Sequence, residues 1–554
     1  MNRFRNMTLM LALVLVTLLV LSGVRKIESS LDNTIREEKL RFTGQVSSEA
    51  PPAVVFTSVA LGSFRGLLAD ILWLRSESLK SKKNYFEMVQ LARWITDLQP
   101  NYSGGTVYLA WNLAYNISVT SSSYEDRWYW VNEGIKLIRD KAMLYNPDDP
   151  LLYKELSWIY LHKLGNLMDD AHLYYKNQMA IQMTNILAGS LNDLQPLADA
   201  PVGKEAFMKK YPADHELWSM LRKAGYEDYD ALAAAFRKPV RAALPEELEK
   251  VLPAGYYQAL DAHLRAELLR ERMKLDPALM VKIDNKYGKM DWRVPESMAI
   301  YWAEKGVEKS IADGRKPDVN CVRIVTHGLQ AAFRSGRLVM IANDSSTTQA
   351  VPNINLADSA YKAFESAEDE YKSTGAGESF RSAKINYLKD AIPLIYIHGD
   401  MKKAQEFYEK LTGIDGKQRN AKTGALFQNL DEFVMYHFAE DVRDADVEKA
   451  NSVVSGLVQR AVYNLLQGER DAAVANERLA HFIYNEYMKK NKDVKRNQLP
   501  PYDVIKGNMI SAILKNLQEN RPEWAKRLQA EIDAERQEKE ESKELEQTKE
   551  TNAM

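Results

Sequence analysis

Three side chains that could act together in chemistry lie close in the sequence. Asp169, Asp170 and His172 fall within four residues, and carboxylates with an imidazole serve both in metal sites and in acid–base catalysis. On a helix Asp169 and His172 share a face at i and i+3, whereas Asp170 points away. One helix therefore supplies at most two ligands, and the chain has no HExxH or similar motif. A polar turn at a helix start is the simpler interpretation, because aspartate is favoured there.

The single cysteine, Cys321, lies six residues before His327. A lone cysteine excludes an intrachain disulfide and a multi-cysteine zinc site. Cys321 and His327 could lie close enough in the fold to form a Cys–His nucleophile, but no other feature supports one. A buried structural cysteine is the better interpretation. No segment has the spacing of a phosphate-binding loop, a dinucleotide-binding loop or a G-x-S-x-G elbow. We therefore expect no catalytic residue, no metal ligand and no cofactor.

Tryptophan and tyrosine crowd residues 111–175. Most of these rings are expected to pack between helices, although exposed rings on a helical-repeat surface would also suit a peptide or a sugar. Consecutive helical residues point about 100° apart, so the three rings at 128–130 cannot all be buried in one narrow stripe. The amides at 112 and 116 could bind such a ligand or only bridge adjacent helices. The predicted partner surface consists of Trp111, Asn112, Tyr115, Asn116, Trp128, Tyr129 and Trp130.

Length and charge limit the class of protein. At 554 residues the chain is too long for one compact core and predicts several domains or a repeat array. Its 45% hydrophobic and 27% charged composition is ordinary for a folded protein. The 74 lysines and arginines nearly balance the 76 acidic residues, so the formal net charge is -2. This balance removes the global electrostatic argument for nucleic-acid binding, and we expect no nucleic-acid partner.

The N-terminus has the pattern of a membrane anchor. Arg3 and Arg5 precede an uncharged, mostly apolar run at 7–24, which ends at Arg25 and Lys26. The run is long enough to span a bilayer, and residues 21–24 lack the small-residue pattern of a cleavage site. We therefore expect an uncleaved signal anchor, with cleavage as the alternative. An N-terminal span before a long body most often leaves that body outside the cytoplasm.

A second apolar run covers residues 53–74. Arg65 and Asp70 lie inside it, and either charge at the bilayer centre would cost roughly 2.5–3.5 kcal/mol. We prefer a buried first helix of the folded body to a second membrane span.

Apolar runs of helical period recur along the chain, each closed by a turn or a proline. The clearest is at 396–414, and weaker ones lie at 84–100 and 467–480. In these runs the chain resembles the tetratricopeptide repeat (TPR) family, whose 34-residue unit pairs two antiparallel helices. The resemblance implies a solenoid of helical hairpins and says nothing about the ligand. The matching residues are Asn84, Tyr85, Met88, Ala92, Ile95, Pro100, Gly399, Asp400, Ala404, Tyr408, Leu411, Gly468, Ala473 and Ala480.

The expected fold is all-α, with an N-terminal transmembrane helix before a degenerate TPR-like solenoid that contains an irregular helical insert. Closely spaced prolines limit helix length in the insert. Strand signals are weak, and the best candidate, 337–343, could equally be helix. The predicted segments are an anchor (1–26), a stalk and linker (27–52), N-terminal repeats (53–193), the insert (194–291), C-terminal repeats (292–496), a terminal helix (497–530) and a charged disordered tail (531–554).

These patterns favour a non-enzymatic scaffold that binds protein partners in a cell-envelope complex. Segments such as FRGLLADILWLR and DWRVPESMAIYW resemble membrane-anchored repeat proteins of bacteria. That resemblance supplies no activity. With the N-terminal anchor, the expected location is a bacterial inner membrane, crossed once, with the body in the periplasm. Two alternatives stay open. One is an envelope enzyme that uses Asp169, Asp170 and His172, and the other is a glycan- or peptide-binding module that uses the aromatic cluster.

Overall fold

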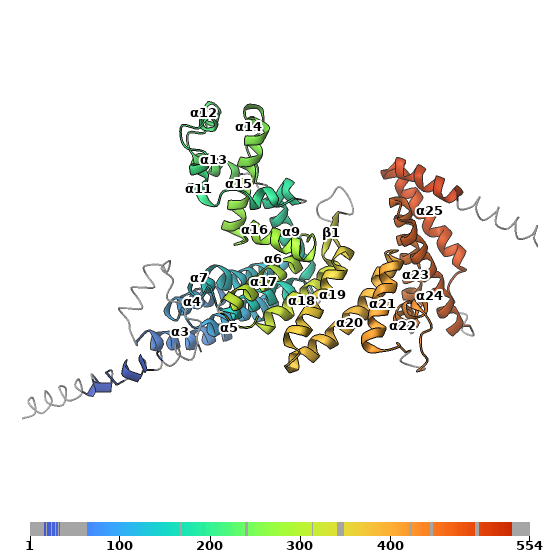
Figure 1. The fold of residues 1–554 in the computed structure, drawn as a ribbon, viewed down its shortest axis with the longest axis horizontal. Coiled ribbons are helices and arrows are strands. Elements are labelled where there is room, and N and C mark those ends of the chain that lie inside the picture. The colour runs from blue at the N-terminus through green and yellow to red at the C-terminus, as the bar shows by residue number, and fades with distance from the viewer. Residues whose placement is uncertain are drawn as a thin grey trace, which may run out of the picture. The chain divides into compact units, whose positions relative to one another are not determined.

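The structure is a computed structural model of the chain. It describes residues 64–534 except 166–168, 192, 239–241, 313, 341–347, 420–423, 444–446 and 493–497, together with scattered residues between 16 and 33. Nearly all regular structure in this part is helical, so the prediction of an all-α protein is confirmed (Figure 1). The chain forms two compact units, Met1–Asn353 and Ile354–Met554. The seven predicted segments stay a prediction.

Much of the predicted anchor, and nearly all of the stalk and linker, lies outside the described residues. Within the part that the structure describes, no helix is both long enough and apolar enough to cross a bilayer. Of the second apolar run, only 64–74 is described, as the start of α3 (Phe64–Ser81). Ala69 is buried there, but Leu67, Ile71 and Leu74 are 59%, 53% and 74% exposed. The expectation that this helix is buried is therefore wrong for its apolar face.

The first unit begins with helical hairpins. Its second helix packs against α3, and α5, α6, α8 and α9 each run on without a break into a segment of different pitch. The elements are α4 (Tyr85–Leu98), α5 (Ser103–Trp111), η1 (Asn112–Ile117), η2 (Ser118–Thr120), α6 (Tyr124–Lys136), η3 (Leu137–Ala142), α7 (Met143–Tyr145), α8 (Pro150–Trp158), η4 (Ile159–Leu164), α9 (His172–Leu187) and η5 (Ala188–Leu191).

Three of these segments, η1, η3 and η4, are π-helical and six residues long. In a π-helix the backbone N–H bonds to the carbonyl five residues earlier, as Ser118 does to Leu113 and Gly165 to Tyr160 (3.0 Å). The wider turn shifts the side chains that follow it around the helix axis. Such segments are rare and occur frequently at functional sites.

Short helices follow in the range that was predicted as an irregular insert. Several of them begin at or just after a proline, because proline has the fixed φ of a helix start and needs no N–H partner there. Pro245 and Pro253 precede α14 and α15, and Pro277 opens α16. The elements are α10 (Gln195–Ala198), α11 (Gly203–Lys210), α12 (Glu216–Lys223), α13 (Tyr229–Arg237), α14 (Glu246–Val251), α15 (Ala254–Arg272) and α16 (Pro277–Tyr287).

The first unit closes on α17 (Pro295–Ala312) and α18 (Val319–Ser335). α17 packs against α8, η4 and α18, and most of its residues are buried. A two-stranded antiparallel ribbon follows, with Arg337 opposite Val351 and Met340 opposite Thr348. Its strands are β1 (Arg337–Met340) and β2 (Thr348–Val351). The candidate strand at 337–343 is therefore a strand over 337–340, and 341–343 lie outside the described residues.

The second unit is also built of helical hairpins. The α20–α21 turn carries Gly399 at φ +86°, where a Cβ would lie 2.3 Å from the backbone nitrogen of Ala472. Asp400 then caps α21 by accepting from the Lys403 N–H (2.9 Å). The terminal helix predicted at 497–530 is two helices, α25 and 522–534, because Pro522 interrupts it. The other elements are η6 (Ile354–Leu356), α19 (Ala357–Tyr371), α20 (Gly375–Ile397), α21 (Met401–Asp415), α22 (Leu430–Arg443), α23 (Val447–Gln467), α24 (Arg470–Lys490) and α25 (Tyr502–Asn520).

Candidate functional site

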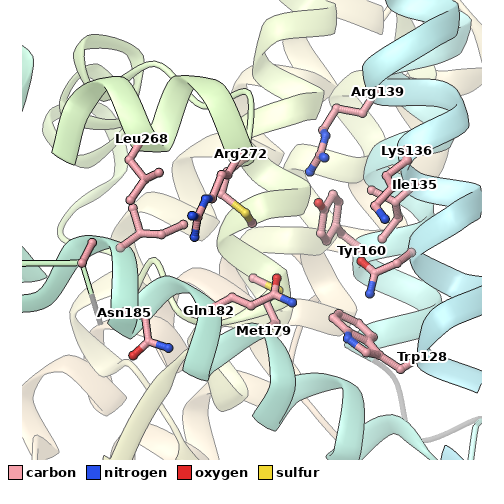
Figure 2. A pocket seen from close by; sticks show the side chains of 14 residues that line it. Trp128, Ile135, Lys136, Arg139, Tyr160, Met179, Gln182, Asn185, Leu268 and Arg272 are labelled. Atoms are coloured by element: carbon pink, nitrogen blue, oxygen red, sulfur yellow. The ribbon is translucent and has the colours of Figure 1, made fainter. Parts of the chain in front are cut away.

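A cavity of about 350 Å³ opens in the first unit among α6, η3, η4, α9 and α15 (Figure 2). This volume lies in the range of small-molecule sites in proteins. We call it the cationic cavity, because three of its side chains are lysine or arginine and none is aspartate or glutamate. It is lined by Trp128, Asn132, Ile135, Lys136, Arg139, Tyr160, Met179, Gln182, Asn185, Ile186, Ala242, Leu268, Arg272 and Met273.

Arg139 is the most buried cation of the cavity, with 8% of its side chain exposed. Its Nε and Nη2 donate to the Asp140 carboxylate at 2.6 and 2.9 Å. Burial alone would lower the pKa of Arg139, but the hydrogen bond to Asp140 and the interaction with Tyr160 raise it. Burial also raises the pKa of the Tyr160 phenol, against the effect of Arg139. Arg139 therefore stays charged and holds Tyr160 at the cavity wall.

The other two cations differ in their partners. The Lys136 Nζ donates to Glu133 at 3.0 Å, and Glu133 also accepts from Arg93 at 2.6 Å. Arg272, the last residue of α15, makes no hydrogen bond or ion pair with any described residue. Its guanidinium is therefore free to bind a ligand.

Three amide side chains also line the cavity without a partner. Asn132 comes from α6, and Gln182 and Asn185 come from α9. None of the three hydrogen-bonds to another residue in the described part of the chain. Since an amide offers two donors and one acceptor, together they provide polar groups for a ligand or for water.

The π-helical segments position two residues of this wall. Arg139 lies in η3 and Tyr160 in η4, on neighbouring helices whose pitch widens at these residues. η4 also holds Lys163, which belongs to the next cluster of polar residues, and His162, whose ring stacks on Trp158 at 4.7 Å between centroids.

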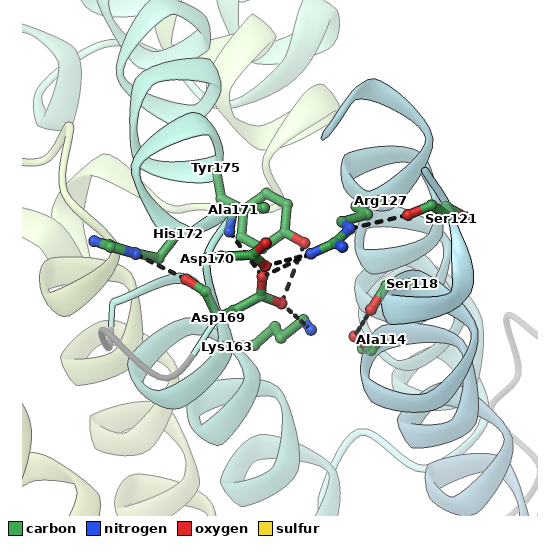
Figure 3. Close-up of polar contacts among 10 residues, drawn as sticks. All are labelled: Ala114, Ser118, Ser121, Arg127, Lys163, Asp169, Asp170, Ala171, His172 and Tyr175. Carbon is green, nitrogen blue, oxygen red and sulfur yellow. Dashed lines mark hydrogen bonds and ion pairs between the residues drawn. The ribbon is translucent and has the colours of Figure 1, made fainter. Parts of the chain in front are cut away.

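A buried ion-pair network lies beside the cavity (Figure 3). The Lys163 Nζ donates to Asp169, and both side chains are at most 6% exposed. Asp169 also accepts from the Ala171 N–H (2.9 Å) and the Tyr175 hydroxyl (3.4 Å), and Arg127 lies 3.5 Å away. Burial by itself would raise the pKa of Asp169, but these hydrogen bonds and the Lys163 charge outweigh it and lower that pKa.

The three residues first considered for chemistry take part in this network as a polar turn. Asp170 pairs with Arg127, and the His172 ring nitrogen Nδ1 meets the Asp169 carbonyl at 2.8 Å. Within the described residues no group of three histidine, cysteine, aspartate or glutamate side chains could hold a metal ion. The turn precedes α9, as the simpler interpretation of the sequence expects.

The rings at 128–130 point three ways. Trp128 faces the cationic cavity and stacks on Tyr175, with ring centroids 5.9 Å apart. Trp130 is 4% exposed and packs against Phe86 and Tyr85. Tyr129 is 42% exposed and contacts Phe86 at 5.9 Å between centroids. The predicted partner surface is therefore divided among separate environments.

The remaining residues of that surface form a second group on α5 and η1. Trp111 is 40% exposed and stacks on Tyr115 at 4.7 Å. Asn112 is buried and accepts from Asn116 (2.6 Å) and from Lys80 of α3 (3.0 Å), so it bridges helices. Burial raises the pKa of the Tyr115 phenol, whose hydroxyl has no hydrogen-bond partner in the described part of the chain.

Cys321 is buried, as the better interpretation of the sequence expects. Burial raises the pKa of its thiol, and its Sγ lies 3.7 Å from the Pro150 carbonyl. Burial lowers the pKa of His327 on the same helix.

Sequence reasoning missed most of the cavity wall. Of its fourteen residues only Trp128 belongs to the predicted surface. No spacing rule joins Arg139, Tyr160, Gln182 and Arg272, which come from four separate helical segments. Local charge gave no signal, because Lys136 and Arg139 lie beside Glu133 and Asp140 on the same helix.

The comparisons give no further identification. No family model matches the chain, and no curated protein or solved structure is significantly similar to it.

Proposed function

We propose that this protein is a non-enzymatic helical-repeat scaffold of the TPR-like kind, which binds a protein partner through its first unit. The observation that carries the proposal is an exposed aromatic pair, Phe86 and Tyr129, at 71% and 42% exposure. Both rings contact Trp130, which is buried and fixes them in place. Large exposed rings on a rigid support are typical of interface hot spots.

The hairpins of the second unit support the TPR-like part of the proposal. Gly399 and Asp400 lie at the α20–α21 turn, and Ala404 and Leu411 are fully buried on α21. Gly468 has φ +84° at the α23–α24 turn. These are the positions at which the sequence resembles the repeat family, and hairpins of this type stack into surfaces that bind other proteins.

The N-terminal sequence supports a place at the membrane. The apolar run at 7–24 lies between positive residues on both sides. In this proposal it anchors the chain in a bacterial inner membrane, with the two units in the periplasm. A labelling reagent that cannot cross the membrane tests the orientation. Modification of an introduced surface cysteine in intact spheroplasts is expected, and protection until lysis would contradict the periplasmic placement.

The partner is tested by crosslinking and affinity purification of the full chain from its own membrane. Phe86→Ala with Tyr129→Ala should lower partner recovery at least tenfold, because two hot-spot rings together contribute about 2–4 kcal/mol. Tyr463→Ala, which removes a 37% exposed ring from the second unit, is the matched control and should leave recovery unchanged. Equal recovery with the double variant and the parent would reject this surface, and recovery of no stable partner would reject the scaffold function.

A further inference from the structure

The cationic cavity carries more positive than negative charge. Lys136, Arg139 and Arg272 line it, whereas the carboxylates that contact these cations are only Glu133 and Asp140. Glu133 is shared with a further cation, Arg93, and is 5% exposed, so it neutralises less than one full charge at the cavity wall.

Arg272 is the residue best placed to meet a ligand. It reaches into the cavity from the α15 side, opposite Arg139, Lys136 and Tyr160 (Figure 2). The neighbouring Glu271 carboxylate does not neutralise the charge of Arg272, because it pairs with Arg237 at 2.6 Å. An anion in the cavity would thus pair with the Arg272 guanidinium, which has no protein partner among the described residues.

The rest of the cavity wall is suited to the apolar part of an organic ligand. Trp128, Met179 and Leu268 offer apolar surface, with the amides of Gln182 and Asn185 beside it (Figure 2). The Asn132 amide also lines the cavity. The volume of about 350 Å³ admits a small molecule and is too small for a folded element.

We infer that the cationic cavity is a binding site for a small organic anion, which is a function separate from partner binding. Its carboxylate or phosphate group lies against Arg272 and Lys136, and its apolar body contacts Trp128 and Met179. Charge-assisted hydrogen bonds are about twice as strong as neutral ones, so the anionic group supplies most of the selectivity. A cation is repelled here, and a neutral molecule leaves Arg272 unpaired.

The test is a calorimetric titration of the full chain with four probes. Benzoate and phenyl phosphate share an apolar ring and differ in the anionic group, benzamide is the neutral counterpart of benzoate, and inorganic phosphate lacks the ring. We expect saturable binding of benzoate, phenyl phosphate or both, at least tenfold weaker binding of benzamide, and affinity that falls as salt rises. Whichever of benzoate and phenyl phosphate binds more tightly identifies the anionic group that the cavity prefers. Weaker binding of inorganic phosphate than of phenyl phosphate measures the contribution of the apolar ring.

Matched variants connect this binding to the cavity. Arg272→Glu should weaken the preferred anion at least tenfold, and Gln182→Ala should weaken it about threefold. The controls are Arg222→Glu and Gln258→Ala, which make the same changes at exposed residues of α12 and α15 outside the cavity, and they should bind as the parent does. Circular dichroism melting curves show whether each variant is folded.

Several results would overturn the inference. These are no saturable binding of either aromatic anion below about 10 mM, benzamide binding as tightly as the preferred aromatic anion, or unchanged affinity in the folded Arg272→Glu variant. Partner recovery in the purification experiment is independent of these titrations, so failure of one proposal is distinguishable from failure of the other.

Discussion

The two units each contain a cavity between helices, and the two cavities differ in chemistry. The cavity of the second unit, about 220 Å³, lies among α23, α24, α25 and residues 522–534. Its wall is mostly aliphatic, and its charged residues are paired, Arg470 with Glu531 at 2.8 Å and Lys506 with Glu477. We call it the apolar cavity. The cationic cavity instead has one arginine and three amides with no partner among the described residues.

Helical hairpins leave cavities in both units, and polar groups without a protein partner decide which cavity can recognise a ligand. In the apolar cavity the charges compensate one another, so the site gains little from an ion. Local helix geometry follows the same division. Among the described residues, π-helical segments occur only in the first unit, where η3 and η4 present Arg139 and Tyr160.

The largest effect is expected at the buried ion pair beside the cationic cavity. Lys163→Met leaves the buried Asp169 carboxylate with only the more distant Arg127, 3.5 Å away, which should cost about 3 kcal/mol of local stability. The pKa of Asp169 is lowered below its ordinary 3.8, so the contribution of the pair is complete above that pH and is lost as pH falls through the lower value. Hydrogen-exchange mass spectrometry of α8 and α9 in rising urea measures the loss.

A second variant separates charge from packing at this pair. Lys163→Met combined with Asp169→Leu leaves no buried charge, and most of the stability should return. If the double variant is as unstable as the single one, the pair stabilises the first unit by shape and not by charge, and the contrast with the second unit disappears.

The next largest effect is expected at the wall of the apolar cavity. Leu528 is fully buried in a cluster with Val462, Leu466 and Leu517, so Leu528→Ala removes methyl groups and enlarges the cavity. The expected cost is about 2–4 kcal/mol, and it should not change between low and high salt. Urea unfolding of the second unit, followed by hydrogen exchange, gives the value. Val474→Ala, at a 59% exposed position of the same wall, is the control and should cost under about 0.5 kcal/mol. A marked salt dependence would contradict the apolar description.

A smaller effect, dependent on pH, is expected at Asp284 of α16. Burial raises its pKa to about 6, although the Met290 N–H and the Trp292 indole donate to its Oδ1 at 3.2 Å and lower it. A carboxyl with a raised pKa contributes stability that is fully present below its ordinary pKa of 3.8 and is lost as the pH rises from there through about 6. Asp284→Asn keeps the acceptor without the charge, so it should gain about 1 kcal/mol at pH 7.5 and almost nothing at pH 4, after allowance for partial exposure.

Melting curves at the two pH values measure this difference. Glu205→Gln, at an exposed carboxylate of α11, is the control and should show no difference between them. A gain of equal size at both pH values would mean that ionisation of Asp284 is not the cause.

Much of the fold could be predicted from local sequence signals. The turn at Gly399, the cap at Asp400 and the helix starts at Pro253 and Pro277 each follow from the backbone properties of one or two residues. The divergence of the rings at 128–130 followed from the 100° rotation per helical residue. The exposure of Ile71 could not be predicted in this way, because an apolar run does not show which of its faces another element covers.

The candidate site could not be predicted in the same way. Arg139 and Arg272 line the same cavity only because α15 packs against α9 and the hairpins that precede it. No short-range sequence pattern encodes that packing. The π-helical segments are equally hidden, because a change from four- to five-residue hydrogen bonding alters neither composition nor hydrophobic period enough to be read. Asp169 was visible as a charged residue, but its partner Lys163 could be assigned only once η4 and the turn were in place.

The smallest effect on stability, and the sharpest contrast, is expected from two arginines at the cavity walls. Arg272→Ala removes an unpaired side chain, and Arg470→Ala breaks an ion pair in which the arginine is 67% exposed, so each should change stability by less than about 0.5 kcal/mol. Benzoate titration should separate them, because Arg272→Ala loses the ligand's main partner whereas Arg470→Ala leaves the cationic cavity intact. Melting temperatures and titrations of both variants with the parent test this directly. If the two variants bind benzoate equally well, an unpaired guanidinium does not distinguish a recognition site from a packing gap in this protein.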